Sequence, residues 1–239
     1  AISCSGIFFL ASLLKLTARP SGNCSREVWR CSWALLLSRA FEAHRWNWTM
    51  NNGSKELLAN HPEWYAVSRD GKSCATHPPY VGYYRWLCPS KPEVIAFLKN
   101  EAEKILSKDY IDGLHLDYIR FCDVVLPLNL WSQYKVDQRT EMAEYDFCYC
   151  ETCRAKFKAQ TGKDPLEFTY PDEALSWRLF RYEAINNVVN TLAEVAQKHK
   201  KWISAAVFPT PASPVKMGLF CRLRKRMSMI CLISASRPR

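Results

Sequence analysis

Apolar and polar residues follow regular periods only in the middle of the chain, about residues 41–209. Residues 41–50, FEAHRWNWTM, alternate with a period of two and run into the turn sequence NNGS, which predicts a strand. The stretch DGLHLDYIRF predicts a second strand from Gly113 to Phe121, and WISAAVF at 202–208 predicts a third.

Two helices are predicted between these strands. Ser90-Lys91-Pro92-Glu93 has the form of a capping box, and the apolar positions after it predict a helix to about Lys108. A second helix is predicted from Pro171 to about His199, because one face collects apolar side chains: Leu175, Leu179, Tyr182, Ile185, Val189, Leu192 and Val195. Strands that alternate with helices indicate an α/β fold with a parallel sheet, either doubly wound or a (β/α)8 barrel. No GxGxxG or GxxxxGK[ST] motif follows a strand, which disfavours nucleotide binding.

Composition separates the two ends from this middle. The chain has 239 residues, 48% of them apolar, and a net charge of +10. Residues 195–239 hold ten Lys or Arg and no Asp or Glu, which accounts for the whole excess, so a nucleic-acid partner is not favoured for the neutral body. The apolar run at 7–14 is far shorter than the roughly 20 residues that span a bilayer. It is also a weak candidate for a signal peptide, because no Met or basic segment precedes it. We expect a poorly patterned segment at 1–40 and a basic, disordered or non-native tail at 212–239.

An acid in the predicted strand at 113–121 suggests a functional site. With a period of two, Leu114 and Leu116 share one face of the strand, and His115 and Asp117 share the other. In a barrel the second pair points inward, and Asp117 lies near the mouth where active sites are found. The alternative is a structural Asp117 that pairs with Arg120 or His115; the pattern alone favours neither.

Several runs resemble bacterial glycosyl-hydrolase-like family 10 proteins, hypothetical glycosidases with TIM-barrel domains. These runs lie within about 41–211 and are HRWNWTMNN, HPEWYAVSRDGKSC, PPYVGYYRWLCPS, DGLHLDYIRF, EYDFCYCETCRAKFKAQTG and SAAVFP. The resemblance implies an α/β, partial (β/α)8 TIM-barrel-like domain at 41–211, with Asp117 as the leading catalytic carboxylate and a secreted or periplasmic location. The chain departs from the family pattern at Phe121-Cys122, where Tyr-Pro is usual. The family's domain also continues beyond SAAVFP, so we expect a truncated barrel with ends that are not native barrel sequence.

Glycoside hydrolysis ordinarily uses two carboxyl groups. Asp123 is the candidate for the second, although a surface loop Asp is the commoner explanation for such a residue. Sugars stack on aromatic rings and need hydrogen-bonding groups beside them. The candidate binding residues are His44, Trp46, Trp48, Tyr80, Tyr84, Trp86, His115 and Arg120, while core packing is the alternative for each aromatic residue. The predicted function is a glycoside hydrolase-like protein, with a non-catalytic carbohydrate-binding fragment or truncated gene product as the alternative and a nucleic-acid binder ranked last.

The sequence Cys148-Tyr149-Cys150-Glu151-Thr152-Cys153 is CxCxxC, a spacing that can place three thiolates around one tetrahedral ion. It resembles the structural zinc knuckle of family 42 β-galactosidases, in which an earlier cysteine completes the set. Cys122 is the first candidate for the fourth ligand, with Cys88 behind it. Free thiols or one disulfide are the alternatives. No cofactor is expected to be required for catalysis, and any zinc is expected to be structural.

Overall fold

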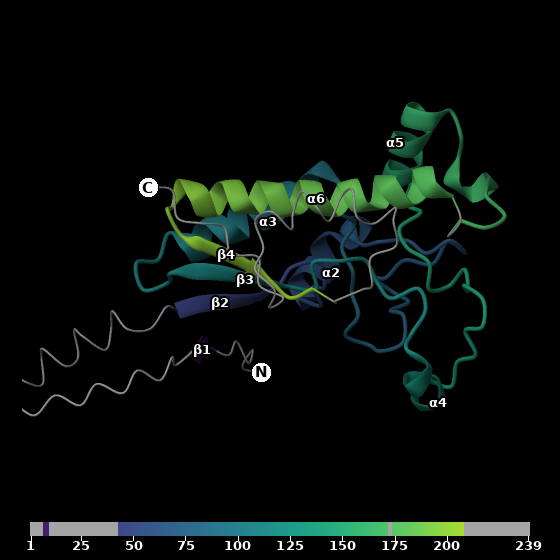
Figure 1. The fold of residues 1–239 in the computed structure, drawn as a ribbon, viewed down its shortest axis with the longest axis horizontal. Coiled ribbons are helices and arrows are strands. Elements are labelled where there is room, and N and C mark those ends of the chain that lie inside the picture. The colour runs from purple at the N-terminus through teal and green to yellow at the C-terminus, as the bar shows by residue number, and fades with distance from the viewer. Residues whose placement is uncertain (1–6, 10–42, 172–173, 208–239) are drawn as a thin grey trace, which may run out of the picture.

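The computed structural model describes residues 7–9, 43–171 and 174–207. They form an α/β arrangement whose central sheet has the strand order β1-β2-β3-β4. Strands β2 (Ala43–Trp48), β3 (Gly113–Asp117) and β4 (Trp202–Ala205) are parallel, and β1 (Ile7–Phe9) pairs antiparallel with β2. The predicted parallel sheet is therefore confirmed as a small one of three strands, shown side by side in Figure 1.

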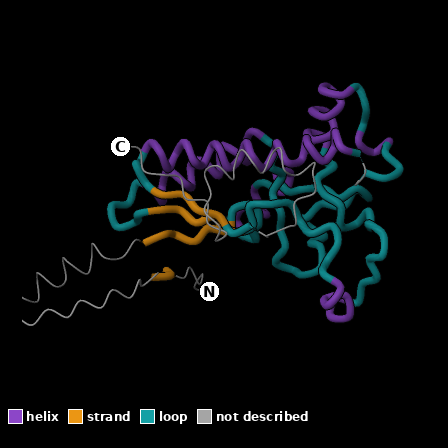
Figure 2. Tube along the Cα trace, in the orientation of Figure 1, coloured by secondary structure: helices purple, strands orange, loops and turns teal. Residues whose placement is uncertain are grey.

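Two long helices cover one face of this sheet. Helices α3 (Pro92–Leu106) and α6 (Leu175–Lys198) contact each other, and both lie on the same side of the strands (Figure 2). Leu114 and Leu116 of β3 are fully buried, as the period of two predicts for the side chains that face the helices. The sheet therefore has one apolar face, packed on helices, and one face left for polar and aromatic side chains.

The start of α3 differs in detail from the predicted capping box. Lys91, not Ser90, is the N-cap residue, and no side chain caps the helix. The Ser90 hydroxyl is buried and has no hydrogen-bond partner among the residues that the structure describes. Pro92 occupies the first turn, where its missing N–H has no intrahelical partner to lose, and the helix still begins where it was predicted.

The predicted apolar face of α6 is wrong for its first half. Leu175, Leu179 and Tyr182 are exposed, whereas Trp177 and Phe180 are buried. The first half packs its aromatic rings on α5 (Glu151–Thr161), because Phe157 of α5 contacts both Trp177 and Phe180. Only the second half follows the expected stripe, in which Leu192 and Val195 are buried.

Long connections beyond the carboxyl ends of the strands build a second lobe, on the right in Figure 1. The connection from β2 to α3 holds the short helices α2 (Lys55–Asn60) and η1 (Pro62–Trp64). The connection from β3 to α6 contains η2 (Leu128–Leu130), α4 (Trp131–Tyr134), α5 and η3 (Pro165–Glu167). Asp117 is the residue at which the second connection begins, and Cys88, Cys148, Cys150 and Cys153 all lie in the two connections.

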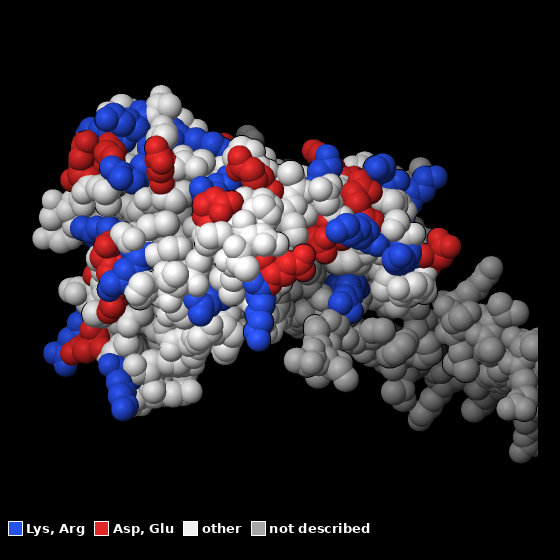
Figure 3. Space-filling model, turned by 180° about the vertical axis from the view of Figure 1, so that it is seen from behind, with Lys and Arg blue, Asp and Glu red and all other residues white. Residues whose placement is uncertain are grey.

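Charged side chains of both signs are interspersed on the face of the molecule seen in Figure 3. That distribution agrees with the balanced charge of residues 1–194. Among the described helices, none has the length and apolar character needed to cross a bilayer. The predictions for 1–40 and 212–239 fall almost entirely outside the described residues.

Candidate substrate cleft and cysteine centre

The polar face of the sheet collects side chains from three strands. Trp46, His115 and Ser204 are register partners on β2, β3 and β4, and Trp48 is the partner of Asp117. Partners in a parallel sheet point to the same side, so these residues share one face. Trp46 and Trp48 are 39% and 48% exposed, which leaves their rings accessible to a ligand.

Asp117 is the last residue of β3, the strand between β2 and β4, and its carboxylate borders a cleft of about 330 Å³. The Trp46 indole Nε1 donates to Asp117 Oδ2 at 3.0 Å, and the Tyr118 amide donates to Oδ1 at 2.8 Å. Each carboxylate oxygen thus has a donor, and the plane of the group is fixed. Its role in catalysis stays a prediction.

Tyr118 ends the strand and forms part of the cleft. Its φ of +50° is left-handed, so the chain turns sharply after Asp117 and β3 is shorter than predicted. The Tyr118 ring lies 5.1 Å from the Trp48 ring and 6.0 Å from the Tyr84 ring, centroid to centroid. Sequence reasoning missed Tyr118, although an aromatic residue directly after the candidate acid was a signal for it.

Arg120 and Asp123 form an ion pair in the loop after β3. Their side chains approach to 2.9 Å and are each 25% exposed. The Arg120 guanidinium also lies 5.1 Å from the Trp86 ring centre and 5.6 Å from the Tyr118 ring centre. Arg120 lines the cleft and Asp123 is not among its lining residues, so the pair holds the loop in shape beside Asp117.

Two of the predicted sugar-binding aromatics support the cleft from behind. Trp86 is only 1% exposed and packs on Tyr84 and Tyr118, so it is a core residue. Tyr80 stacks on Tyr145 with ring centroids 4.2 Å apart, and its hydroxyl donates to the Asp123 carbonyl at 2.9 Å. For Trp86 the core-packing alternative describes the structure, whereas Tyr80 is half-buried and Tyr84 lines the cleft.

A row of polar side chains crosses the sheet below Asp117. The Ser204 hydroxyl lies 2.9 Å from His115 Nδ1 and 3.5 Å from His44 Nδ1. The His115 ring lies 4.4 Å from the Trp46 ring, and burial lowers the pKa of His115 below its usual value. His44 lies over Gly113, where a Cβ would come within 2.8 Å of its ring, so glycine is needed for this approach.

The second candidate site is a cluster of four buried cysteines. The sulfur atoms of Cys88, Cys148, Cys150 and Cys153 all lie within 4.8 Å of one another, and Cys88 is 3.5 Å from both Cys150 and Cys153. Four sulfurs around a metal with bonds of about 2.3 Å stand roughly 4 Å apart, so the cluster could hold an ion such as zinc. The predicted convergence of Cys148, Cys150 and Cys153 is confirmed.

The fourth member of this cluster is Cys88, and Cys122 lies outside it. Cys122 is buried in the loop beside Asp123, and burial raises the pKa of its thiol. Cys88 reaches the other three because residues 64–68 pair with two distant segments. Tyr65 bridges to Leu87, and Ser68 bridges to Phe147.

The environments of the four sulfurs differ. The Val67 amide donates to Cys148 Sγ at 3.4 Å, and burial raises the pKa of Cys148. Hydrogen bonds from Cys148, Cys153 and Cys88 lower the pKa of Cys150, which is the N-cap residue of α5. Zinc binds cysteine as the thiolate, so an ion held by these four sulfur atoms would displace their protons.

A buried ion pair fixes the segment that leads into the cluster. Arg181 of α6 bonds the Asp146 carboxylate and the Phe147 carbonyl, and Asp146 is 1% exposed. Tyr149 donates to Asp146 at 2.5 Å and accepts from the Trp177 indole at 3.1 Å. Helix α6 therefore holds the CxCxxC segment in place through its own polar contacts.

Comparison with known proteins gives a distant likeness. No known family profile and no curated protein sequence matches the chain. Among solved structures, the β-galactosidase from Bacillus circulans sp. alkalophilus is similar with a TM-score of 0.41 and 12% sequence identity. The likeness covers 83% of this chain and 35% of the enzyme, so the chain spans about a third of that enzyme's length. A likeness at this level assigns neither a family nor a substrate.

Proposed function

We propose that the chain is a glycoside hydrolase-like protein that binds a carbohydrate in the cleft at the end of β3, with Asp117 as the leading catalytic carboxylate. The observation that carries the proposal is the position of Asp117 at the carboxyl end of a parallel strand, open to a cleft. In a (β/α)8 barrel the catalytic residues have this place, and a partial barrel is the architecture we propose for residues 41–211.

The aromatic residues around Asp117 support a sugar as the ligand. Trp48 lies between Tyr83 and Tyr118 at ring distances of 6.2 and 5.1 Å, and Tyr83 is 52% exposed. The apolar face of a pyranose stacks on such rings, and its hydroxyls need polar groups beside them. His115 and Arg120 supply those groups next to the rings.

Hydrolysis needs a partner for Asp117. The Asp123 side chain pairs with Arg120, so in the present geometry it is engaged with a cation beside the cleft. We therefore assign Asp117 the role of nucleophile or base, and the second proton-transfer group would be a residue other than Asp123. A carbohydrate-binding protein without hydrolysis is the alternative that this arrangement supports.

Calorimetry with a panel of oligosaccharides tests the cleft. Trp48→Ala should abolish binding of whichever sugar the wild type takes, whereas Tyr110→Ala should leave it unchanged. Tyr110 is the matched control, because it is 71% exposed and lies just before β3, at the opposite edge of the sheet. Asp117→Asn should keep binding and lose hydrolysis. A wild-type chain that binds none of the sugars, or equal effects of the two aromatic variants, would contradict the proposal.

We also propose that Cys88, Cys148, Cys150 and Cys153 bind one structural zinc ion. Four sulfur ligands leave no open position for a catalytic water, so the ion would tie segments together instead of taking part in chemistry. Metal analysis of the purified chain should find about one zinc per chain. Cys88→Ser should reduce that content, whereas Cys122→Ser, at a buried cysteine outside the cluster, should not; the reverse pattern would refute this set of ligands.

A further inference from the structure

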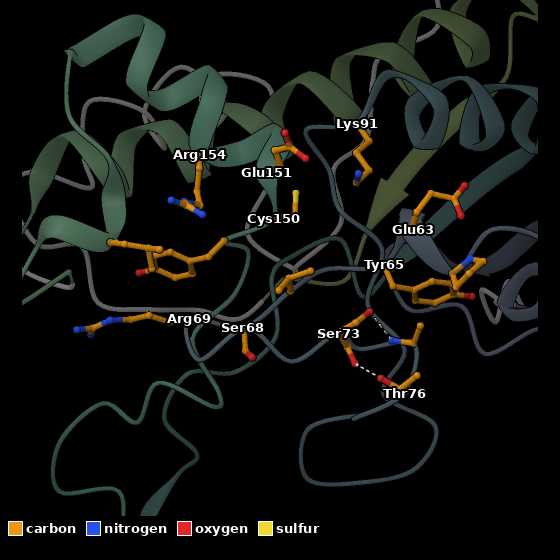
Figure 4. A pocket seen from close by; sticks show the side chains of 16 residues that line it. Glu63, Tyr65, Ser68, Arg69, Ser73, Thr76, Lys91, Cys150, Glu151 and Arg154 are labelled. Atoms are coloured by element: carbon orange, nitrogen blue, oxygen red, sulfur yellow. Dashed lines mark hydrogen bonds between the residues drawn. The ribbon is translucent and has the colours of Figure 1, made fainter.

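One residue of the cysteine cluster is less deeply buried than the other three. Cys150 is 6% exposed, against 0% for Cys88 and 1% for Cys148 and Cys153. Cys150 also lines a pocket of about 560 Å³ whose lining residues include none of its three partners. Figure 4 shows Cys150 in the wall of this pocket, between Arg154 on one side and Lys91 on the other.

We propose that Cys150 is the site at which small soft electrophiles and peroxides modify the four-cysteine centre. The order of reactivity among the four thiols follows from the pocket. Only the release of metal, described below, rests on the proposed zinc site.

Cys150 stands at the start of helix α5 as well as in the wall of the pocket. Cys150 precedes the first turn of α5, a helix of eleven residues, and the positive end of the helix dipole lies next to it. The Lys91 ammonium reaches the same turn, where it donates to the Thr152 hydroxyl at 3.4 Å. Glu63 and Glu151 line the same pocket and offset part of this positive charge, so access from the pocket, more than charge, distinguishes Cys150 from its three partners. Arg154 contributes less, because Asp164 neutralises it through a bidentate pair.

With hydrogen peroxide the chemistry has two steps. The Cys150 thiolate attacks one peroxide oxygen, the O–O bond breaks, and the departing hydroxide takes a proton to become water, which leaves a sulfenic acid. Cys88, whose sulfur lies 3.5 Å away, then attacks the sulfenic sulfur, and the hydroxyl leaves as a second water. Two thiols are oxidised to one disulfide and the peroxide is reduced to two waters. The metal would keep only two of its four thiolates and would be released.

The first test is the order of alkylation in the full-length chain. The reduced protein, with and without prior removal of metal by a chelator, is treated with limiting iodoacetamide and the modified cysteines are mapped by mass spectrometry. In both forms Cys150 should react roughly fivefold faster than Cys88, Cys148 and Cys153, in line with their exposures of 6% against 0 to 1%. The buried thiols of Cys74 and Cys122 are internal controls and should lag with the other three.

A second variant tests the effect of positive charge beside the pocket. Lys91→Gln should slow the reaction of Cys150 with iodoacetate, which is an anion, more than its reaction with neutral iodoacetamide. Lys99→Gln is the matched control. Lys99 is exposed on α3, the helix whose N-cap residue is Lys91, and it does not line the pocket. After one equivalent of peroxide, digestion without reductant should yield a peptide pair joined through Cys150 and Cys88.

The outcomes separate this inference from the proposed zinc site. Zinc present with all four thiols equally reactive, or with Cys88, Cys148 or Cys153 reacting first, overturns the inference and leaves the zinc site standing. Zinc absent with Cys150 first overturns the zinc site and supports the inference. Modification of Cys150 only at the rate of Cys74 would mean that reagents enter by global unfolding, which also overturns it.

Discussion

Substitution of Arg181 in helix α6 should lower the stability of the folded chain strongly, because its ion pair with Asp146 is buried. Its guanidinium bonds Asp146 and the Phe147 carbonyl, and it lies 5.4 Å from the Phe121 ring and 5.5 Å from the Trp177 ring. The Arg181 and Asp146 side chains are 13% and 2% exposed. Arg181→Met keeps most of the side-chain volume and removes the charge, so it isolates the contribution of the ion pair.

The expected loss of stability follows from what remains around Asp146. Without Arg181, the buried carboxylate keeps the Tyr149 hydroxyl as a donor and loses the guanidinium that pairs with it. Breaking a buried pair from one side costs about 3–5 kcal/mol. Replacing both partners, in Arg181→Met with Asp146→Asn, should recover roughly 1–3 kcal/mol of that loss, because no uncompensated charge is left.

Urea unfolding followed by far-UV circular dichroism measures these free energies. Arg139→Met is the matched control, because Arg139 pairs with Asp137 at 3.3 Å while the two side chains are 84% and 63% exposed. An exposed pair of this kind contributes at most about 1 kcal/mol. A loss below about 1 kcal/mol in Arg181→Met, or effects of Arg181 and Asp146 that simply add, would refute the reasoning.

Three other predictions concern the core and the polar row. Trp177→Ala should lower the free energy of unfolding by about 3–5 kcal/mol in the same urea experiment, because the fully buried ring stacks on Phe180. Gly113→Ala should cost about 1–3 kcal/mol, and His44→Ala in the same chain should restore most of it, because the three atoms nearest to the added Cβ all belong to the His44 ring; equal melting temperatures of wild type and Gly113→Ala would contradict this. Burial holds the folded-state pKa of His115 below 6.5, so its contribution to stability is present above that value and is lost as pH falls through the folded pKa. Thermal melts should therefore show that lowering pH below about 6.5 destabilises the wild type more than His115→Gln, and parallel pH profiles would argue against it.

Local sequence patterns predicted the elements that carry Asp117. The strand at Gly113 and the helix at Pro92 begin where the period and the proline place them. The end of β3 could not be predicted, because the left-handed conformation of Tyr118 depends on the aromatic rings that surround it. The exposed first half of α6 was missed for a similar reason, since the α5 aromatics decide which face of that half is buried.

The choice between Cys88 and Cys122 as the fourth cysteine could not be made from the sequence either. Cys122 was the first candidate because it follows a predicted strand and so corresponds to the earlier cysteine of the zinc knuckle that the motif resembles. Cys88 joins the motif because residues 64–68 pair with the segments around Leu87 and Phe147, which are some sixty residues apart. Contacts between segments this distant have no signature in the spacing of either one.

The Ser204 hydroxyl between two imidazoles links the tautomers of His115 and His44. A hydroxyl has one proton to donate, so at most one of the two Nδ1 atoms can accept from Ser204. If Ser204 donates to His44, a neutral His115 must carry its proton on Nδ1 to bond Ser204, and its Nε2 then becomes an acceptor. If Ser204 donates to His115, the proton of His115 moves to Nε2, which becomes a donor. A rotation of one serine hydroxyl on β4 therefore decides whether the histidine beside Asp117 offers a lone pair or a proton.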